Sequence, residues 1–349
     1  MDDYFSVRWE EGVVKMLDQR YLPGEVVYRD IVQCEEVANA IRQMIIRGAP
    51  AIGIAAGFGL ALSAFHSKAT QTGELISELN NAADKLRKSR PTAVNLFGAI
   101  DRILSSVSMA KGLDVNQIKH LVTNEAQKIA DEDIQMNKKI AMNGQQFIPD
   151  NAIVIHHCNT GALATGGYGT ALGVIRAAHE SGKKIHVYVD ETRPRLQGAR
   201  LTSWELKQLG IPHTVIVDGA SGYFMRSTRI DACLVGCDRI AANGDVANKI
   251  GTYNLALVAF AHGVPFYSVG PTTTIDLTIA SGDEIPIEER SDREVTHIGD
   301  IKVTPDDIKV ANPAFDITPS KYICAIITNA GVAYPPYNKS LAKLMNEEV

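Results

Sequence analysis

The sequence predicts an α/β protein with a carboxyl-terminal Rossmann-like domain, in which helices cover both faces of a mostly parallel sheet. A smaller, mainly helical amino-terminal domain with a short β element is expected to precede it. Two patterns indicate this fold. From about residue 150, strand-like segments alternate with helix-length segments, and these strands are almost continuously apolar, as in sheets buried on both faces. The 349 residues fit two domains, which we place at 1–130 and 131–349.

The amino-terminal domain is expected to begin with short strands and turns, including a turn at Pro23-Gly24. The pattern is helical from Cys34 to Phe65, and further amphipathic helices are expected over Glu74–Leu86, Asn95–Val107 and Val115–Phe147. The longest apolar run, Ala49–Leu62, is dense in glycine and alanine and shorter than the ~20 residues that span a bilayer. We therefore expect no membrane insertion.

The carboxyl-terminal domain is expected to alternate strands with helices. The strands are Ala152–His157, Lys184–Asp190, His213–Asp218, Asp231–Asp238 and Pro265–Gly270, the last closing the series. The helices cover Thr165–Glu180, Ala199–Leu209, a short segment near Ser221, and about Lys249–His262. Such alternation indicates βαβ units, whose ligands bind beyond the carboxyl ends of the strands. Four reactive side chains lie at such ends: Cys158, Asp190, Asp218 and Asp238.

Composition and charge exclude several classes of function. The net charge of -5, with no dense Lys/Arg block, argues against a nucleic-acid-binding protein. The amino end is acidic and polar, unlike a signal peptide. The odd number of cysteines suggests reduced thiols in a cytoplasmic protein rather than a disulfide framework. They are Cys34, Cys158, Cys233, Cys237 and Cys324.

A dinucleotide site is the first alternative to weigh. Gly167-Tyr168-Gly169 precedes an expected helix, and Asp190 ends the next strand, which resembles the Rossmann fingerprint. However, Leu172 occupies the third glycine position, and the glycines stand too far from the end of the preceding strand. The stretch therefore reads better as a glycine-rich turn, either close to an anion or simply tightly packed.

Cys158 and Asp238 each allow two readings. A cysteine in an apolar run is usually a small core residue, but Cys158 stands at a strand-to-loop switch, where main-chain N–H groups activate thiols. Asp238 is either a carboxylate that pairs with a base or caps a turn, or a general acid or base in a partly desolvated pocket. Position alone leaves both open.

Several segments suggest anion binding. Arg47-Gly48-Ala49 directly precedes Pro50, which suits a helix amino end and therefore a phosphate; the alternative is a surface arginine before a buried helix. Arg90 also precedes a proline. Asn248-Lys249 reads as another helix start, with Asn248 as an ordinary N-cap or a ligand. Gln197 is either a polar substrate contact or part of a helix start.

No metal site is expected. His156 and His157 are adjacent, so on a strand they face opposite sides and do not readily share an ion. The spacing of Cys233 and Cys237 is not that of a metal-binding pair, and both read as core residues.

Together these segments resemble the methylthioribose-1-phosphate isomerases. The resemblance is carried by IRGAPAIGIAAGFGLAL, SRPTAVNL, HHCNTGALATGGYGTALG, VDETRPRLQGARLTSWEL and GCDRIAANGDVANKIGTYNLAL, and it extends over essentially the whole chain. The wider superfamily also contains ribose-1,5-bisphosphate isomerases and regulatory subunits of the eukaryotic initiation-factor exchange complex. A departure is TNAGVAYPPYNKS near the end, where a more acidic, charged stretch is typical.

The resemblance implies a cofactor-free and metal-free isomerase of methionine salvage, which converts 5-methylthioribose 1-phosphate into 5-methylthioribulose 1-phosphate. It implies a homodimer formed through the carboxyl-terminal domain. Cys158 and Asp238 match the catalytic pair, which the regulatory subunits typically lack. The substrate-binding segments match Arg47, Gly48, Ala49, Arg90, Gln197, Asn248 and Lys249. The sequence leaves open a related substrate, 5-deoxyribose 1-phosphate or ribose 1,5-bisphosphate, and the choice between proton transfer and hydride shift.

Overall fold

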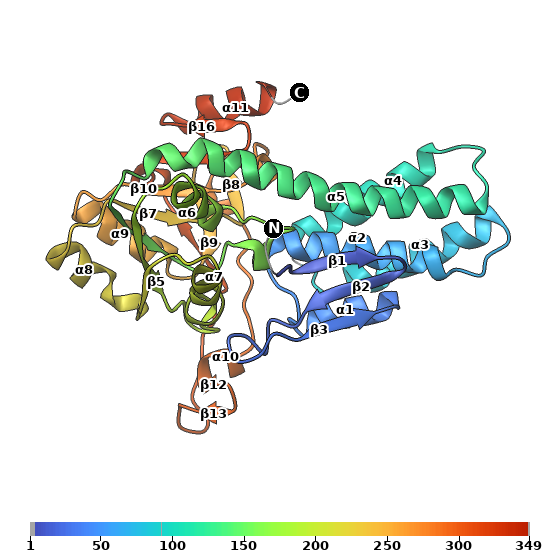
Figure 1. The fold of residues 1–349 in the computed structure, drawn as a ribbon, viewed down its shortest axis with the longest axis horizontal. Coiled ribbons are helices and arrows are strands. Elements are labelled where there is room, and N and C mark those ends of the chain that lie inside the picture. The colour runs from blue at the N-terminus through green and yellow to red at the C-terminus, as the bar shows by residue number, and fades with distance from the viewer. Residues whose placement is uncertain (1–3, 92, 348–349) are drawn as a thin grey trace. The chain divides into compact units, whose positions relative to one another are not determined.

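The computed structural model describes residues 4–91 and 93–347. The chain forms two compact units, which are described separately below (Figure 1). The first contains the described residues up to Gln135 together with Ala162–Gly169, and the second contains Met136–Gly161 and the described residues from Thr170 onward. The domain boundary expected after residue 130 stays a prediction.

The first unit is mainly helical with a small antiparallel sheet, as predicted. Its strands are β1 (Val7–Glu10), β2 (Val13–Leu17) and β3 (Tyr28–Ile31), in that order. Its helices are α1 (Cys34–Arg42), α2 (Ala49–His66), α3 (Thr72–Arg87), α4 (Val94–Met109) and most of α5 (Val115–Gly144), which continues into the second unit. The expected helical stretch from Cys34 to Phe65 is two helices, because Met44 and Gly48 adopt left-handed backbone angles between them.

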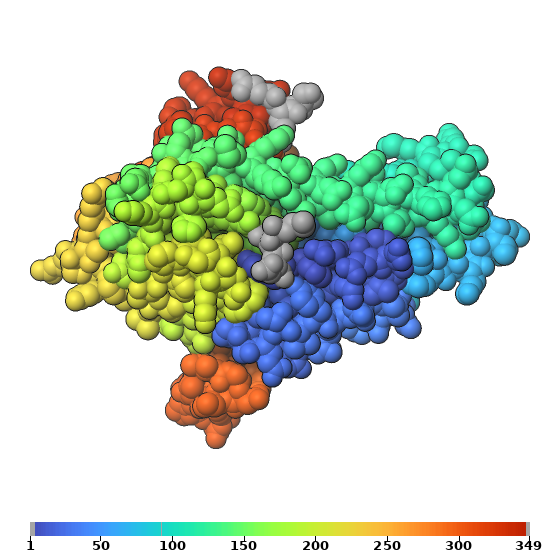
Figure 2. Space-filling view, in the orientation of Figure 1, coloured from blue at the N-terminus to red at the C-terminus, as the bar shows by residue number. Residues whose placement is uncertain are grey.

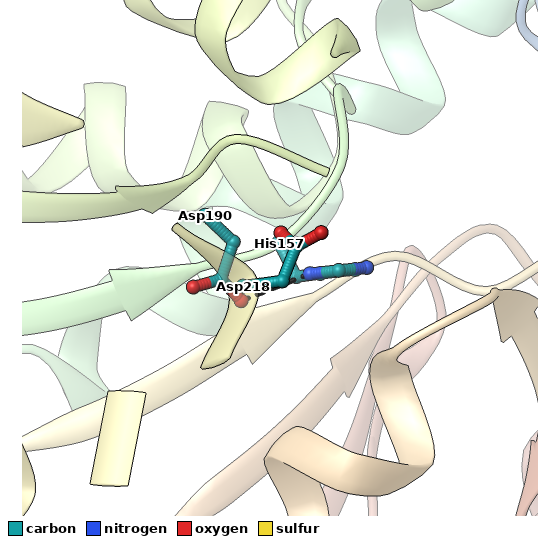
Figure 3. Close-up of side chains that lie close together, drawn as sticks. All are labelled: His157, Asp190 and Asp218. Carbon is teal, nitrogen blue, oxygen red and sulfur yellow. Dashed lines mark hydrogen bonds and ion pairs between the residues drawn. The ribbon is translucent and has the colours of Figure 1, made fainter. Parts of the chain in front are cut away.

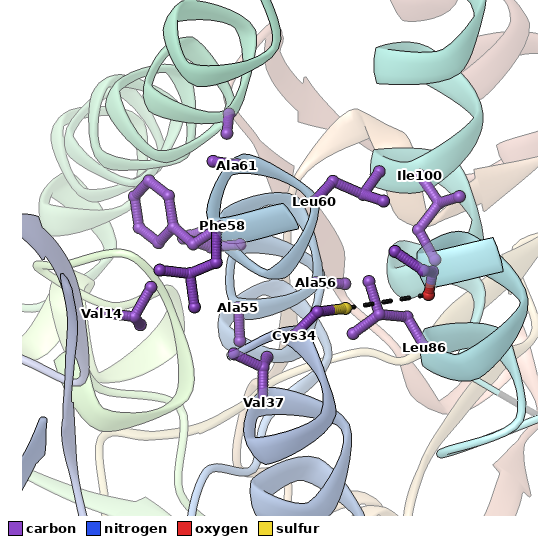
Figure 4. Packing of buried hydrophobic residues seen from close by; sticks show 14 of the residues in the cluster. Val14, Cys34, Val37, Ala55, Ala56, Phe58, Leu60, Ala61, Leu86 and Ile100 are labelled. Carbon is purple, nitrogen blue, oxygen red and sulfur yellow. Dashed lines mark hydrogen bonds between the residues drawn. The ribbon is translucent and has the colours of Figure 1, made fainter. Parts of the chain in front are cut away.

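Helix α2 forms the centre of the first unit's core (Figure 4). It is apolar on all sides, and Phe58 and Leu60 are completely buried. A Cβ atom on Gly53 would lie 2.8 Å from the carbonyl oxygen of Asn95, so this glycine permits a close approach of α4. The helix is longer than the predicted apolar run, and among the described helices it alone has the length and composition of a membrane span. Because 72% of that span is buried, we interpret it as a core helix.

The second unit is built on a seven-stranded sheet of order β16-β15-β10-β7-β4-β5-β6. These strands are β4 (Ala152–His156), β5 (Ile185–Asp190), β6 (His213–Ile216), β7 (Ala232–Val235), β10 (Phe266–Val269), β15 (Ala325–Thr328) and β16 (Gly331–Ala333). Neighbours pair in parallel except β15 and β16. The predicted fold class is therefore confirmed. The prediction that Pro265–Gly270 closes the series is wrong, because β15 extends the sheet beyond β10.

Helices cover both faces of this sheet. They are α6 (Ala171–Glu180), α7 (Ser203–Gln208), α8 (Ser221–Ser227), α9 (Thr252–Ala261) and α11 (Tyr337–Glu347). Alternate residues of β7 enter two different cores: Cys233 and Val235 pack with α9, whereas Ala232 and Leu234 pack with α6. This alternation explains why the strands read as continuously apolar in the sequence.

A second small sheet flanks the large one, in the order β11-β8-β9-β14. Its strands are β8 (Arg239–Ala241), β9 (Val246–Lys249), β11 (Ile275–Asp276) and β14 (Phe315–Thr318). After helix α10 (Arg293–Thr296), the hairpin β12 (His297–Ile298) and β13 (Ile301–Lys302) projects from its unit, in orange in Figure 2.

Two helix starts differ from prediction. Asn248 and Lys249 end strand β9 rather than opening a helix, and α9 begins only after Gly251, whose φ of +100° requires glycine. Likewise, the helix expected from Thr165 begins at Ala171, because residues 162–169 form a turn-rich segment first.

Candidate active site

The topology of the second unit marks a site between two neighbouring strands. From β4 the sheet continues through β5 and β6 in one direction, and from β7 through β10 and β15 in the other. The β4–β7 boundary is therefore a topological switch point, where open α/β sheets bind ligands beyond the strand ends. Cys158 follows β4 by two residues, and Asp238 follows β7 by three. Both residues singled out in the sequence thus lie at the predicted kind of position.

Cys158 is held by its main chain rather than by packing alone. It is buried and has a φ of +70°, an unusual backbone angle for a non-glycine residue. Its N–H donates to Thr192 Oγ1 over 2.9 Å, and its carbonyl oxygen accepts from Thr202 Oγ1 over 2.7 Å. Its thiol is therefore the polar group of Cys158 that remains available for chemistry.

Gln197 lies beside this thiol. Its Nε2 donates to Cys158 Sγ over 3.5 Å. Its Oε1 is buried and has no hydrogen-bond partner among the described residues. A buried acceptor without a partner costs about 1–3 kcal/mol. The amide therefore offers an acceptor to a hydroxyl donor, and of its two sequence readings a substrate contact agrees better with this geometry.

Asp238 is half-buried at the entrance to the small sheet. Its N–H donates to the carbonyl oxygen of Ala247 over 2.9 Å, which places it beside the end of β9 that carries Asn248. A Cβ atom on Gly236 would lie 2.8 Å from Thr160 Cγ2 and 3.8 Å from Asn248 Oδ1. The segments that follow β4, β7 and β9 therefore lie close together at this edge of the sheet.

Asn248 and Lys249 have well-defined partners. The Asn248 Nδ2 donates to Thr252 Oγ1 over 3.0 Å, so the amide is oriented by the first residue of α9. The Lys249 Nζ donates to the carbonyl oxygen of Ala314 over 2.6 Å and lies 4.7 Å from the ring centroid of Phe315. The β8–β9 hairpin, rather than a helix cap, positions this pair.

The remaining predicted substrate-binding residues belong to the first unit. Gly48 is the N-cap of α2 and Ala49 its first residue, so the predicted helix amino end is confirmed. A Cβ atom on Gly48 would lie 2.4 Å from the carbonyl oxygen of Ala164, and this close approach requires glycine. Arg47 and Arg90 are partly buried, each shortly before a helix. Their role in anion binding stays a prediction.

His157, Asp190 and Asp218 form a network that the sequence does not predict (Figure 3). The His157 Nε2 faces the carbonyl oxygen of Ile250 at 2.9 Å, and because a carbonyl only accepts, this nitrogen carries a proton. The Nδ1 bonds to Asp190 Oδ2 at 2.9 Å, and Asp190 Oδ1 accepts from Ser221.

Asp218 completes the network through the main chain. Its two carboxylate oxygens accept the N–H groups of Thr192 and Arg193, each over 2.7 Å. The ligand-type atoms of His157, Asp190 and Asp218 lie within 4.8 Å of one another, but both ring nitrogens and all four carboxylate oxygens already have hydrogen-bond partners. The three side chains therefore belong to a hydrogen-bond network that holds the ends of β4, β5 and β6 together. No signal in the sequence pairs His157 with Asp190.

His156, by contrast, faces the opposite side, as predicted for adjacent residues. Burial lowers its pKa to about 4, so the ring is neutral. It bonds to the carbonyl oxygen of Leu234 at 2.8 Å and to Thr160 Oγ1 at 3.3 Å, and Thr160 in turn accepts the N–H of Leu172. This second network ties the loop after β4 to the first turn of α6.

The ionisation of His157 is expected to make stability depend on pH. Burial alone lowers its pKa, but the hydrogen bond and charge of Asp190, with Cys158 and Asp218, raise it from 6.5 to about 9. The corresponding stability is complete below pH 6.5 and is lost as the pH rises through 9. We expect the free energy of unfolding in urea to fall by about 1–2 kcal/mol between pH 6.5 and 8.

The range from pH 6.5 to 8 lies below 9.0, the ordinary pKa of a thiol. The buried thiols of Cys34 and Cys237 begin to change the free energy of unfolding only near that pH. The His157→Gln variant is the control, since its side chain does not titrate. An equal fall in that variant would contradict the assignment.

Comparison with known proteins identifies relatives over the full length of the chain. A model of the initiation factor 2 subunit family matches residues 45–335. The chain is 55% identical to methylthioribose-1-phosphate isomerase 2 of Pseudothermotoga lettingae and 54% identical to the methylthioribose-1-phosphate isomerase of a Synechococcus species, and each alignment covers 99% of both chains.

Two solved structures are also similar. The crystal structure of 5-methylthioribose 1-phosphate isomerase from Pyrococcus horikoshii OT3 matches with a TM-score of 0.94 and 46% identity, covering 98% of this chain and 96% of that one. The crystal structure of translation initiation factor eIF-2B, subunit delta, from A. fulgidus matches with a TM-score of 0.91 and 41% identity, covering 99% and 100% respectively.

Proposed function

The chain belongs to the methylthioribose-1-phosphate isomerases of the initiation factor 2 subunit family, and we propose that Cys158 and Asp238 carry out its chemistry. It is an aldose–ketose isomerase that converts 5-methylthio-α-D-ribose 1-phosphate into 5-methylthio-D-ribulose 1-phosphate in methionine salvage. The observation that carries the residue assignment is the position of Cys158 and Asp238 beyond β4 and β7, on either side of the switch point.

The substrate poses a specific chemical problem. Its anomeric oxygen carries the phosphate, so the ring cannot open spontaneously as in a free aldose. An acid must protonate the ring oxygen while the C1–ring oxygen bond breaks, and hydrogen must then move from C2 to C1. The proton of the C2 hydroxyl leaves as the ketone forms, and the carboxylate that has given its proton to the ring oxygen accepts it. We assign the acid to Asp238, whose half-buried position limits competition from water.

Cys158 is assigned to the hydrogen transfer. It either moves the proton from C2 to C1 or stabilises the charge that develops between them. The main-chain bonds to Thr192 and Thr202 fix its backbone, which supports a role that depends on exact placement of the thiol. Gln197 next to Sγ is proposed to accept a hydrogen bond from a sugar hydroxyl, because its buried Oε1 otherwise has no partner among the described residues.

The other proposed substrate-binding residues supply groups that suit an anionic sugar phosphate. Arg47 precedes the N-cap Gly48 and Ala49, at an amino end with main-chain N–H groups and a favourable helix dipole. Arg90 adds a second guanidinium, and Asn248 and Lys249 add an amide and an ammonium group.

A non-catalytic regulatory subunit is the alternative that the similarity to the A. fulgidus initiation factor subunit favours. The cysteine–aspartate pair argues against it, because the family resemblance implies that such subunits typically do not keep this pair. The two hypotheses predict different results when Cys158 and Asp238 are substituted. A regulatory subunit would keep its function, whereas an isomerase would lose its activity.

The test is to incubate the protein with three 1-phosphates and follow ketose formation by NMR. They are 5-methylthioribose 1-phosphate, 5-deoxyribose 1-phosphate and ribose 1,5-bisphosphate. We expect rapid conversion of the first, slower or comparable conversion of the second, and at least about 10-fold weaker conversion of the bisphosphate, whose second phosphate requires further cationic donors. Preference for the bisphosphate would overturn the substrate assignment. In D2O, deuterium at C1 of the product indicates proton transfer.

We also propose that the enzyme is a cytoplasmic homodimer. The five cysteines are free thiols, as is usual in a reducing compartment. In the second unit, Tyr223 of α8 and Phe260 of α9 are 69% and 64% exposed, which suits an interface that a second copy covers. Sedimentation equilibrium should give twice the chain mass of 37.8 kDa; a monomer would exclude this proposal.

A further inference from the structure

The loop after β5, residues 191–197, is closely fitted to the end of its own strand. A Cβ atom on the following Gly198 would lie 1.8 Å from the carbonyl oxygen of Asp190, so the chain returns directly onto β5. Within the loop, the N–H of Leu196 donates to the carbonyl oxygen of Thr192 over 2.8 Å. The loop is therefore a fixed element of the site and not an extended surface segment.

Thr192 has the most constrained position in this loop. Its side chain is completely buried, and its φ is +60°, which is rare for a β-branched residue. Such a conformation costs about 1–3 kcal/mol and persists only where surrounding contacts enforce it. Cys158, to which Thr192 is hydrogen-bonded, is also left-handed, with a φ of +70°. Two unfavourable backbone conformations are thus joined by one hydrogen bond beside the thiol.

A chain of hydrogen bonds connects three adjacent strand ends. Asp218, which follows β6, accepts the N–H groups of Thr192 and Arg193 over 2.7 Å each. The Thr192 hydroxyl donates to the carbonyl oxygen of Asp190 over 3.0 Å and accepts the N–H of Cys158 over 2.9 Å. A threonine hydroxyl has one proton and lone pairs to accept, so it can make both bonds at once. Valine has the same shape and can make neither.

We propose that Thr192 is a positioning residue, which sets the backbone of Cys158 through its hydroxyl group and is itself set by the carboxylate of Asp218. This inference rests on the proposed catalytic role of Cys158. The Thr192 hydroxyl bonds to the main chain of Cys158, so it acts on the reaction by placing the thiol. A displacement of about 1 Å at a reacting group reduces turnover by about 100-fold.

The principal experiment compares Thr192→Val with Thr192→Ser in the full-length enzyme, measuring kcat and KM for 5-methylthioribose 1-phosphate. We expect Thr192→Val to lower kcat by about 100-fold with KM changed less than about threefold, because the thiol is misplaced while other substrate contacts remain. Thr192→Ser keeps the hydroxyl and should recover most of kcat.

Thr328→Val in β15 is the matched control. Thr328 is equally buried, and its hydroxyl likewise bonds to a main-chain carbonyl, that of Gly331 over 2.9 Å. It should lose comparable stability in urea and keep the kcat of the parent enzyme. An equal loss of kcat in Thr328→Val and Thr192→Val, or no rescue by serine, would show a general folding effect and overturn the proposal.

Asp218→Asn provides a second variant, should Thr192→Val fail to fold. Asparagine keeps one carbonyl oxygen but directs an N–H2 group at the second main-chain N–H, so we expect kcat to fall by about 10-fold with KM preserved. Unchanged kcat in Asp218→Asn would overturn the proposal that the carboxylate of Asp218 sets the position of Thr192. The Cys158→Ser variant distinguishes failure of the proposed function from failure of the inference on Thr192. If Cys158→Ser stays active, the proposed catalytic role of Cys158 is wrong. If Cys158→Ser is inactive while Thr192→Val is fully active, only the inference on Thr192 is wrong.

Discussion

Replacement of Asp238 by asparagine is expected to abolish turnover while the sugar phosphate still binds. The amide has nearly the same size as the carboxyl group, and the bond from the Asp238 N–H to the carbonyl oxygen of Ala247 belongs to the main chain and is kept. An amide does not give a proton to the ring oxygen, however, so the step that opens the ring loses its acid. General acid–base catalysis contributes about 10²–10⁴-fold, and kcat should fall by at least that factor.

The measurement combines the NMR assay with equilibrium dialysis of 5-methylthioribose 1-phosphate against the inactive variant. Asp231→Asn is the matched control, because Asp231 immediately precedes β7 at its other end and accepts the N–H of Ile153 over 2.9 Å. This control should lose a little stability and no activity. Full activity of Asp238→Asn would remove the acid from the mechanism, and loss of ligand binding in the same variant would indicate a binding role instead.

The carboxyl ends of the strands can be located from the sequence, because burial of a parallel sheet on both faces leaves a local pattern in each strand. Strands covered on both faces are continuously apolar, so the first polar or reactive residue after the run marks the carboxyl end. This rule identifies Cys158 and Asp238. That β4 and β7 are neighbours does not follow from these runs, since strand order depends on pairings between residues about 80 positions apart, as between Ile155 and Cys233.

Short strands and side-chain networks cannot be predicted from the sequence, for related reasons. The β8–β9 hairpin has strands of three and four residues, which are too brief to show a period, and the Asn-Lys sequence at its end imitates a helix cap. The bond between His157 and Asp190 spans 33 positions and depends on the β4–β5 register. The left-handed backbones of Cys158 and Thr192 oppose residue preference, and such conflicts are expected at functional sites.

Replacement of Cys158 by serine is expected to lower kcat by about 10²–10⁴-fold, the usual range for one acid–base group. A thiol is far more acidic than an alcohol and therefore transfers its proton more readily. Serine also forms the two main-chain bonds to Thr192 and Thr202, so the backbone of residue 158 should remain as it is. The loss of activity would then report on the sulfur atom alone.

The control for this substitution is Cys324→Ser, because Cys324 is exposed and its thiol is outside the described networks. That variant should retain full kcat and also serve as the background for alkylation of Cys158 by iodoacetamide. If alkylation of Cys158 and loss of turnover follow the same time course, the thiol lies in the active site. If instead Cys158→Ser keeps turnover within about threefold of the parent, then sulfur chemistry contributes less than about 1 kcal/mol, and the hydrogen moves from C2 to C1 without the thiol.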